Sequence, residues 1–259
     1  MRCGLDILSR FILAAAQRAK VFGRARQAFA IIEFALVLPL LVTMMLGSVE
    51  AARLIIAAQK TTQVASTIAE MLSQNNPGQT PSPSPGPQGQ TKIYPVTYLD
   101  LDFAISSTMV IFPQVLQDAA SKGISWQSDI SISIAGICFG SSSGSCSTSC
   151  TAATCTYANV AWNSGPNKRP CGTAQLSAPD TAEPSRTALP TDIFATSPVS
   201  VIAVDVVYNY TPVFGLGIFG TIPLRRTSYL APRNAPAGSW LSYNVITGDD
   251  GIGAACTGF

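Results

Sequence analysis

An uninterrupted apolar run near the N-terminus constrains this chain more than any other feature. Residues 29–49 read FAIIEFALVLPLLVTMMLGSV, 21 residues with a single charge at Glu33. As an α-helix they would span ~31 Å, the thickness of the hydrocarbon core of a bilayer. A buried helix of a soluble domain seldom runs this long without a polar face, and a cleaved secretory signal has a shorter apolar region followed by a small-residue cleavage site. We therefore expect a single-pass transmembrane helix that is retained in the membrane.

The distribution of charge predicts the orientation of this helix. Residues 1–28 carry six basic side chains and one acidic one, and four of the basic residues come just before the apolar run: Arg18, Lys20, Arg24 and Arg26. After the run, Arg53 and Lys60 are offset by Glu50 and Glu70. The positive-inside rule then places residues 1–28 in the cytoplasm as a basic leader and the rest of the chain on the other side.

Composition excludes several classes of function. The 259 residues include no histidine, only 12% of them are charged, and the net charge is +2. Without histidine there is no Ser-His-Asp or Cys-His catalysis and no His-ligated metal site. A nucleic-acid binder would need a basic face, which this balance does not supply. We expect no enzyme activity, no cofactor, no nucleic acid and no small-molecule substrate.

The cysteines agree with an exported C-terminal part. Cys3 stands alone in the leader, and six others lie beyond the apolar run: Cys138, Cys146, Cys150, Cys155, Cys171 and Cys256. An even number of cysteines in an oxidising compartment predicts two or three disulfides, with the pairing left open. A zinc site would need paired C-x-x-C ligands or histidines, and neither occurs.

The helical pattern continues past the apolar run. One apolar stripe recurs at helical spacing through Val64, Ala65, Ile68, Met71 and Leu72. We expect one helix from about Phe29 to Ser73 within a segment 29–74, which Pro39 should kink or loosen within the membrane. Its protruding half must rest the stripe either on the chain's own C-terminal domain or on a neighbouring subunit.

The remaining sequence divides into a linker and a domain. Residues 75–91 (NNPGQTPSPSPGPQGQT) form a Pro/Gly/Ser linker without charge. Residues 92–259 form an exported domain, helical between Asp100 and Lys122 with a break at Pro113, and with strands expected at 129–137, 199–210 and 221–230. Residues 138–198 suggest disulfide-tied loops. The expected fold class is α+β, with a long N-terminal helix and a small, mainly antiparallel sheet.

Two short motifs suggest chemistry that their context does not support. Residues 140–144 (GSSSG) fit the G-x-S-x-G nucleophile elbow, which needs a histidine base that the chain lacks. Residues 129–133 (DISIS) fit D-x-S-x-S, a pattern that can hold a divalent cation. The isoleucines alternate through this second motif, so Ser131 and Ser133 are expected to face solvent on a strand, and no metal site is expected.

The charged residues in and beside the apolar run can each be interpreted in two ways. A carboxylate inside a transmembrane helix is costly and usually has a partner, although Glu33 lies close enough to the boundary to reach the lipid headgroups. Glu50 and Arg53, at i and i+3, form either a surface pair of little energetic value or a contact at the membrane face of an assembly.

The order of these features resembles the processing site of type IV prepilins. A basic leader is followed by a small residue, Ala28, and then by an apolar helix with glutamate at its fifth position, Glu33. Residues 33–41 (EFALVLPLL), the stretch 47–53 (GSVEAAR) and residues 57–71 are similar to TadE/TadG-like pseudopilins of the Tad (Flp, tight-adherence) pilus system. Residues 204–233 loosely resemble the family's terminal strand pair.

This resemblance implies a set of roles. A prepilin peptidase would cut between Ala28 and Phe29, and Ala28 stands where the family usually has glycine. Glu33 would then meet the N-terminal amine of a neighbouring subunit. Packing between subunits would involve Phe34 and Pro39 in the membrane and Glu50 and Arg53 at its face. Partners would be the membrane, other pilins or pseudopilins, inner-membrane pilus assembly proteins and the peptidase.

The resulting expectation is a minor pilin-like subunit or assembly factor of a Tad-type pilus. It would be anchored in the bacterial inner membrane, with its C-terminal domain in the periplasm or outside the cell. The alternative is a bitopic envelope protein whose exported domain binds a ligand or partner and has no role in a pilus.

Overall fold

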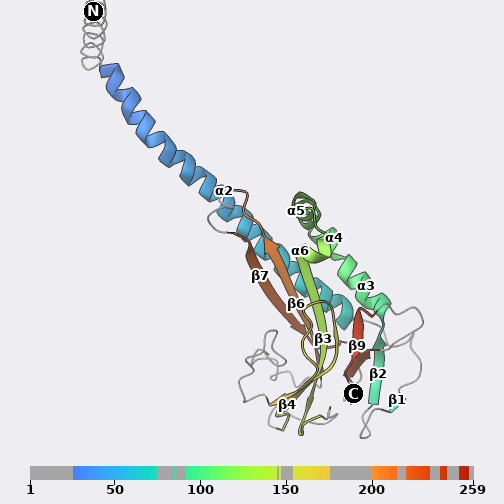
Figure 1. Ribbon diagram of the computed structural model, residues 1–259. Helices are drawn as coiled ribbons and strands as arrows, with labels where there is room; N and C mark the ends of the chain where they lie inside the picture. Colours follow the sequence, from blue (N-terminus) through green and yellow to red (C-terminus); the bar gives the residue numbers. More distant parts are fainter. Residues whose placement is uncertain are drawn as a thin grey trace, which may run out of the picture. The chain divides into compact units, whose positions relative to one another are not determined.

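The computed structural model describes residues 26–74, 84–85, 91–144, 146, 154–175, 200–214, 220–233, 240–243 and 251–256. The chain divides into two compact units, residues 1–53 and residues 54–259, and helix α2 runs through the boundary between them. The expected fold class is confirmed, because a long apolar helix is followed by short helices, antiparallel sheet and disulfides (Figure 1). The elements are α2 (Arg26–Ser73), β1 (Ser84–Pro85), β2 (Thr91–Val96), α3 (Tyr98–Ser106), α4 (Thr108–Ile111), α5 (Gln114–Lys122), α6 (Trp126–Asp129), β3 (Ile130–Gly140), β4 (Tyr157–Ser164), β5 (Gly172–Gln175), β6 (Ser200–Tyr210), β7 (Ile222–Leu230), β8 (Trp240–Tyr243) and β9 (Gly253–Ala255).

Helix α2 is continuous over the whole of the expected range. Its 48 residues correspond to about 72 Å of helix. Pro39 lies inside it, and the helix is not interrupted there. Because proline has no backbone N–H, the carbonyl of Ala35 loses its usual donor at that turn.

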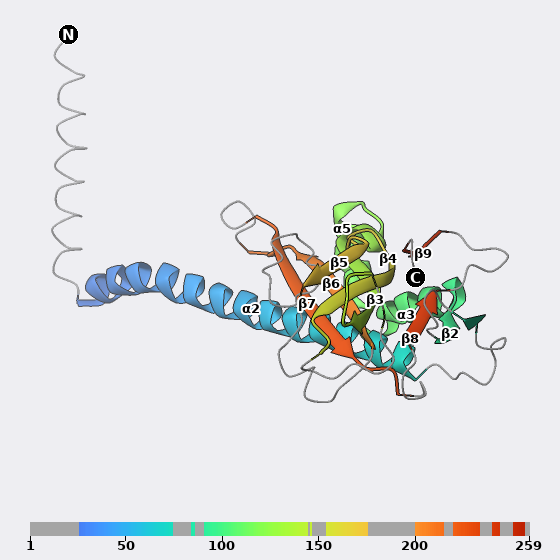
Figure 2. The same cartoon turned by 90° about the horizontal axis from the view of Figure 1, so that it is seen from below.

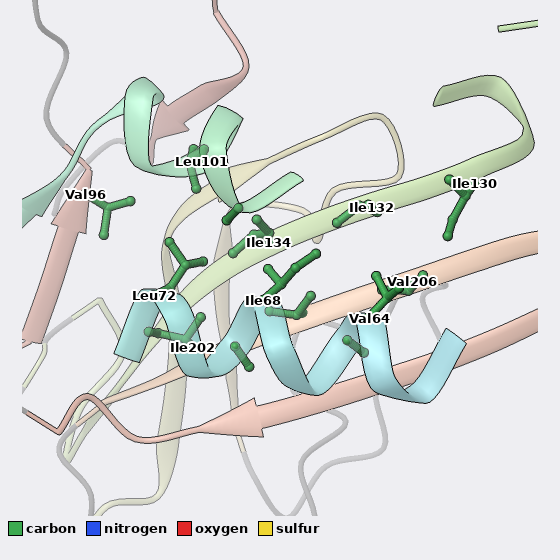
Figure 3. Packing of buried hydrophobic residues seen from close by; sticks show 14 of the residues in the cluster. Val64, Ile68, Leu72, Val96, Leu101, Ile130, Ile132, Ile134, Ile202 and Val206 are labelled. Atoms are coloured by element: carbon green, nitrogen blue, oxygen red, sulfur yellow. The ribbon is translucent and has the colours of Figure 1, made fainter. Parts of the chain in front are cut away.

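The second half of α2 belongs to the core of unit 2. Val64 and Ile68 are fully buried and Leu72 is 2% exposed. Figure 3 shows these side chains directed at the sheet, with Val64 toward Val206 and Leu72 toward Ile202. The apolar stripe therefore packs against the chain's own C-terminal domain. Of the two alternatives given by the sequence, this domain or a neighbouring subunit, the first is observed.

The main sheet is antiparallel throughout. Its strand order is β5-β4-β3-β6-β7, and β9 pairs with β4. Side chains alternate between its faces as a pleated strand requires. On β3 the residues Ile130, Ile132 and Ile134 join the core that includes α2, whereas Ile137 and Phe139 join a second apolar cluster. The three strands expected from the sequence are confirmed as β3, β6 and β7.

The short helices also follow the sequence. Helix α4 ends at Ile111 and α5 begins at Gln114, so the helical structure is interrupted at Pro113 as expected. Helix α3 begins with a capping box, in which the Thr97 backbone N–H donates to Asp100 Oδ2 at 2.9 Å. A second, smaller sheet of order β1-β2-β8 contains β1, which lies within the expected linker. The rest of the linker before Thr91 lies outside the described residues.

The expectation of loops throughout residues 138–198 is wrong, because β4 and β5 lie within this range. Strand β4 was not predicted because it lies in a region rich in Ser, Thr and Gly and itself contains polar Asn159 and Asn163. Both asparagines are buried and make hydrogen bonds to neighbouring loops. Asn159 Oδ1 accepts from the Gly144 N–H at 3.3 Å, and Asn163 Nδ2 donates to the Arg169 carbonyl at 2.7 Å. A bulge between Gly136 and Ile137 also shifts the pairing with β4.

A polar cluster holds α5 against α6 and β6. Lys122 Nζ donates to Asp118 Oδ2 at 2.9 Å, to Asp129 Oδ1 and to the carbonyl of Asn209 at 2.7 Å. Tyr208 Oη donates to Asp118 Oδ2 at 2.6 Å. Asp129 is fully buried, and burial raises its pKa, although Lys122 opposes that effect. Burial and the hydrogen bond to Asp118 likewise raise the pKa of Tyr208.

Replacing Ile68 by alanine should lower the free energy of unfolding by about 2–5 kcal/mol, because it leaves a cavity in a packed core. Ile56→Ala on the same helix is the matched control, since Ile56 is 46% exposed. Its expected effect is within about 0.5 kcal/mol. Denaturant unfolding of the full chain in detergent micelles measures both, and equal losses would contradict the role of α2 as a core element.

Candidate assembly interface

The residues expected to pack between subunits all lie on α2. Ala28 and Phe29 are in its first turn, and their side chains lie outside the described residues. Glu33, Phe34 and Pro39 are exposed, with Phe34 63% exposed. They bring a carboxylate and a broad apolar surface onto one helix in unit 1.

The apolar half of α2 has the properties of a membrane span. From Ile32 onward the helix is long and apolar enough to cross a bilayer, and its most apolar window has no buried side chain. Large exposed side chains follow one another around it, including Leu36, Leu40, Leu41, Met44 and Met45. In water this surface would be strongly unfavourable, and it is what lipid tails or other apolar helices would cover.

Glu33 is the one acidic side chain of this apolar surface. Between Ile32 and Val49 it carries the single charge, and it sits between the exposed Ile32 and Phe34. Within the described part of the chain, no hydrogen bond or ion pair reaches its carboxylate. A carboxylate in apolar surroundings needs a cationic or hydrogen-bonding partner, which a second chain or the lipid headgroups can supply.

Glu50 and Arg53 lie where the apolar run ends. Glu50 is half-buried and Arg53 is exposed. They are separated by one helical turn, so both can reach the same neighbour from the surface of α2. Their role in subunit packing stays a prediction.

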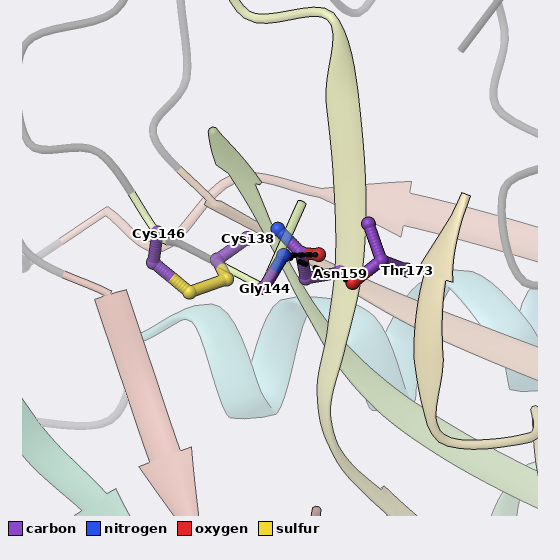
Figure 4. Close-up of a disulfide and its surroundings, with 5 residues drawn as sticks. All are labelled: Cys138, Gly144, Cys146, Asn159 and Thr173. Carbon is purple, nitrogen blue, oxygen red and sulfur yellow. Dashed lines mark hydrogen bonds between the residues drawn. A yellow bond between two sulfur atoms is a disulfide. The ribbon is translucent and has the colours of Figure 1, made fainter. Parts of the chain in front are cut away.

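Among the described residues, four of the six predicted cysteines pair in two disulfides. Cys138 at the end of β3 bonds Cys146, and Cys171 before β5 bonds Cys256 after β9. Cys155 is disulfide-bonded as well, and Cys150 lies outside the described residues. Figure 4 shows the first bond beside Gly144, whose N–H also donates to Thr173 Oγ1 at 3.1 Å. The disulfides thus tie the loops to β3, β4 and β5.

The structure gives no chemical role to the two short motifs. Gly140 ends β3 and residues 141–144 form bends and turns, so the strand–turn–helix of a nucleophile elbow is not present in this described stretch. Asp129 ends α6 and bonds Lys122 rather than pointing into a loop. No group of three or more potential metal-binding His, Cys, Asp or Glu side chains occurs among the described residues.

One detail of the D-x-S-x-S motif was predicted wrongly. Ser133 does not face solvent, because it is 2% exposed and its Oγ accepts a hydrogen bond from the Asn167 N–H at 3.1 Å. Ser131 is half-buried and accepts from Asn167 Nδ2 at 3.0 Å. The loop after β4 folds over this face of β3, which alternation within one strand could not reveal.

The same loop supplies a buried ion pair that the sequence did not indicate. Arg169 is 3% exposed and binds Asp205 of β6 in a bidentate manner, with Nε–Oδ2 and Nη2–Oδ1 distances of 2.7 and 2.9 Å. Its Nη2 also donates to Tyr229 Oη at 2.8 Å. Burial works against the charged form of Arg169, but Asp205 raises the pKa of the guanidinium overall. Nothing in the spacing of residues 169 and 205 connects them.

The described part of unit 2 also contains a cavity large enough for a small group. It has a volume of about 390 Å³ and is lined by α3, α4, α6, β3 and the loop after β4. Its apolar walls include Ile105, Met109 and Trp126, with Asp102 and Lys168 as charged lining residues. No cavity was predicted here, because its walls come from segments distant in sequence.

Comparison with known proteins agrees with the geometry of α2. No curated protein and no solved structure matches the chain. Residues 29–70 match the model of the family described as TadE-like protein, which confirms the resemblance seen in the sequence over this segment. The matched residues are those of α2, from the apolar run through the stripe that packs against the sheet. Over residues 29–70 the chain is therefore similar to TadE-like proteins.

Proposed function

We propose that this protein is a minor pilin-like subunit or assembly factor of a Tad-type pilus, acting through helix packing rather than catalysis. The observation that carries the proposal is the TadE-like match over residues 29–70. That match coincides with a helix whose first half exposes an apolar surface and whose second half is fixed in a folded domain. A pilin-like protein needs both properties on one helix.

The start of the match supports proteolytic processing. It begins at residue 29, the position that follows the proposed cut between Ala28 and Phe29. Removal of residues 1–28 by a prepilin peptidase would create a new N-terminal amine and make Glu33 the fifth residue. The carboxylate of Glu33 would then pair with the amine of a neighbouring subunit. Pairing offsets the cost of holding a charge in an apolar environment.

Orientation and compartment follow from charge and disulfides. The basic leader favours a cytoplasmic N-terminus by the positive-inside rule. The disulfides of residues 138–256 favour an oxidising compartment for the domain. The protein would therefore be a single-pass protein of the bacterial inner membrane. Its partners would be other pilins or pseudopilins and inner-membrane assembly proteins, contacted through Phe34, Pro39, Glu50 and Arg53.

The mature N-terminus provides the first test. In host membranes the N-terminal peptide should begin at Phe29, and in a strain without the prepilin peptidase it should begin at Met1. Mass spectrometry of the purified protein measures both. Deletion of the gene should abolish or strongly reduce surface pili, and complementation with Glu33→Gln should restore cleavage but not piliation. A Met1 start in both strains, or unchanged piliation after deletion, would contradict the proposal.

One specific observation favours the alternative function, ligand binding by a bitopic envelope protein. The cavity beside Trp126 has the size of a small-molecule site, which begins at about 300 Å³. A bitopic envelope protein could bind a ligand there without any role in a pilus. Normal piliation in the deletion strain would favour this alternative.

A further inference from the structure

Two hydrogen bonds fix the direction of β7 along the second half of α2. Arg226 Nε donates to Thr62 Oγ1 at 3.1 Å, and the N–H of Arg233 donates to the carbonyl of Ser73 at 2.9 Å. Later residues of β7 thus lie beside later residues of α2, and the two elements run in the same direction within unit 2 (Figures 1 and 2). Because β6 is antiparallel to β7, it runs back toward the beginning of unit 2.

The paired strands reach the point where unit 2 begins. β6 ends at Tyr210, opposite Ile222, the first residue of β7. Ile222 precedes Arg226 by four residues, or ~13 Å of strand, which corresponds to about nine residues of helix before Thr62. The first residues of unit 2 lie at this level, and Leu54 and Ile222 pack against the same core. The end of β6 at Tyr210 therefore lies at about the level of Leu54 within unit 2.

The surface at this level is apolar on both elements. Ile55 and Ile56 of α2 are 58% and 46% exposed, and Val213 and Phe214 after β6 are 54% and 42% exposed. We refer to these four side chains as the membrane-proximal set. The sequence carries no charged residue between Asp205 and Arg225. Several large apolar side chains exposed together mark a surface that something covers.

We propose that the membrane-proximal set lies against lipid, so that unit 2 contacts the membrane surface directly. This inference rests on the membrane anchoring contained in the proposed function. The argument is continuity of the chain, because α2 carries the apolar run straight to Arg53 and the set begins two residues later. The headgroup region is ~5–8 Å deep on each side of a bilayer, which four or five helical residues cross.

The polar and apolar residues are ordered as this contact requires. Glu50 and Arg53 fall among the headgroups, and Ile55 and Ile56 fall at their outer edge. Val213 and Phe214 follow Tyr210, at the end of unit 2 where α2 enters it. The proposed contact would put them at the boundary between headgroups and tails. An aromatic ring is well suited to that boundary.

Tryptophan fluorescence of the full chain tests the contact. Phe214→Trp is reconstituted in vesicles of phosphatidylethanolamine and phosphatidylglycerol, with or without acyl chains brominated near the headgroup. Phe103→Trp is the matched control, because Phe103 is 70% exposed and lies on α3 with Leu101, at the Leu72 end of the core in Figure 3. Leu41→Trp within the apolar run reports whether the chain spans the bilayer. The unchanged chain supplies the signal of its three native tryptophans for subtraction.

The expected result is loss of the added fluorescence in brominated vesicles for Phe214→Trp and Leu41→Trp, but not for Phe103→Trp. Emission of Phe214→Trp should also shift to shorter wavelength on reconstitution. If Leu41→Trp is quenched while Phe214→Trp behaves like Phe103→Trp, the lipid contact is wrong and the proposed function stands. If Leu41→Trp is not quenched either, both the anchoring and the contact are wrong. Val213→Trp repeats the test at the neighbouring position.

Discussion

Replacing Cys171 and Cys256 together by alanine should lower the free energy of unfolding by about 4–5 kcal/mol, a large part of the stability of a domain. The reason is the length of chain that the bond closes, 85 residues. A cross-link removes more conformational entropy from the unfolded chain when its loop is longer. Denaturant unfolding of the oxidised protein in micelles measures the loss.

The bond between Cys138 and Cys146 is the matched control. Its cysteines are only eight residues apart, so the same relation gives about 2.5 kcal/mol for Cys138→Ala with Cys146→Ala. Each double variant removes two sulfur atoms, and Cys138, Cys146 and Cys256 are all buried. Because Cys171 is exposed, loss of buried surface is no greater in the long-loop variant, and a larger loss there reports the effect of loop length. A short-loop variant as unstable as the long-loop variant would show that local packing dominates.

Lys122→Met should destabilise unit 2 by about 3–5 kcal/mol, because it removes the cation from a buried cluster and leaves Asp129 without its partner. Lys60→Met is the control for loss of one lysine charge, since half-buried Lys60 of α2 bonds neutral Gln63 and no acidic residue among the described ones. Its expected effect is within about 0.5 kcal/mol. The double variant Lys122→Met/Asp129→Asn should recover part of the loss, because no uncompensated charge remains.

The loss in Lys122→Met should also depend on pH. Burial already raises the pKa of Asp129, and removal of Lys122 takes away the main opposing effect. A group whose pKa is higher in the folded state stabilises that state at low pH, and this contribution disappears as pH rises through the folded pKa. The destabilisation should therefore be larger at pH 8 than at pH 5. A loss that stays constant between these values would contradict an ionised Asp129 as its cause.

The parts of the fold predicted from sequence are those with a local pattern. The apolar run, the stripe of Val64 and Ile68, and the alternating isoleucines of β3 each carry their period within a few residues. β4 was missed because Asn159 and Asn163 are polar but buried, and take their partners from the loops on either side of the strand. The ion pair between Arg169 and Asp205 was missed for a similar reason. It forms only because a loop crosses the sheet, and neither residue's local sequence indicates that crossing.

The candidate interface divides in the same way. Glu33, Phe34 and the match over residues 29–70 could be identified from sequence because they belong to one helix. The membrane-proximal set could not, because Val213 is separated from Ile56 by more than half of the chain and reaches its level only through the direction of β6. The cavity beside Trp126 likewise has walls from several distant segments.

The packing of the second half of α2 against the sheet has a mechanical consequence. The chain leaves α2 for the linker only after Ser73, so a pull from the apolar run enters the domain through the helix itself. Within unit 2 the second half of α2 runs in the same direction as β7, so a force along that half acts along the strands. It would have to slide Val64, Ile68 and Leu72 past the sheet all at once, rather than separate one contact at a time. A force along this half of α2 would thus load the interface in shear, with its contacts sharing the force.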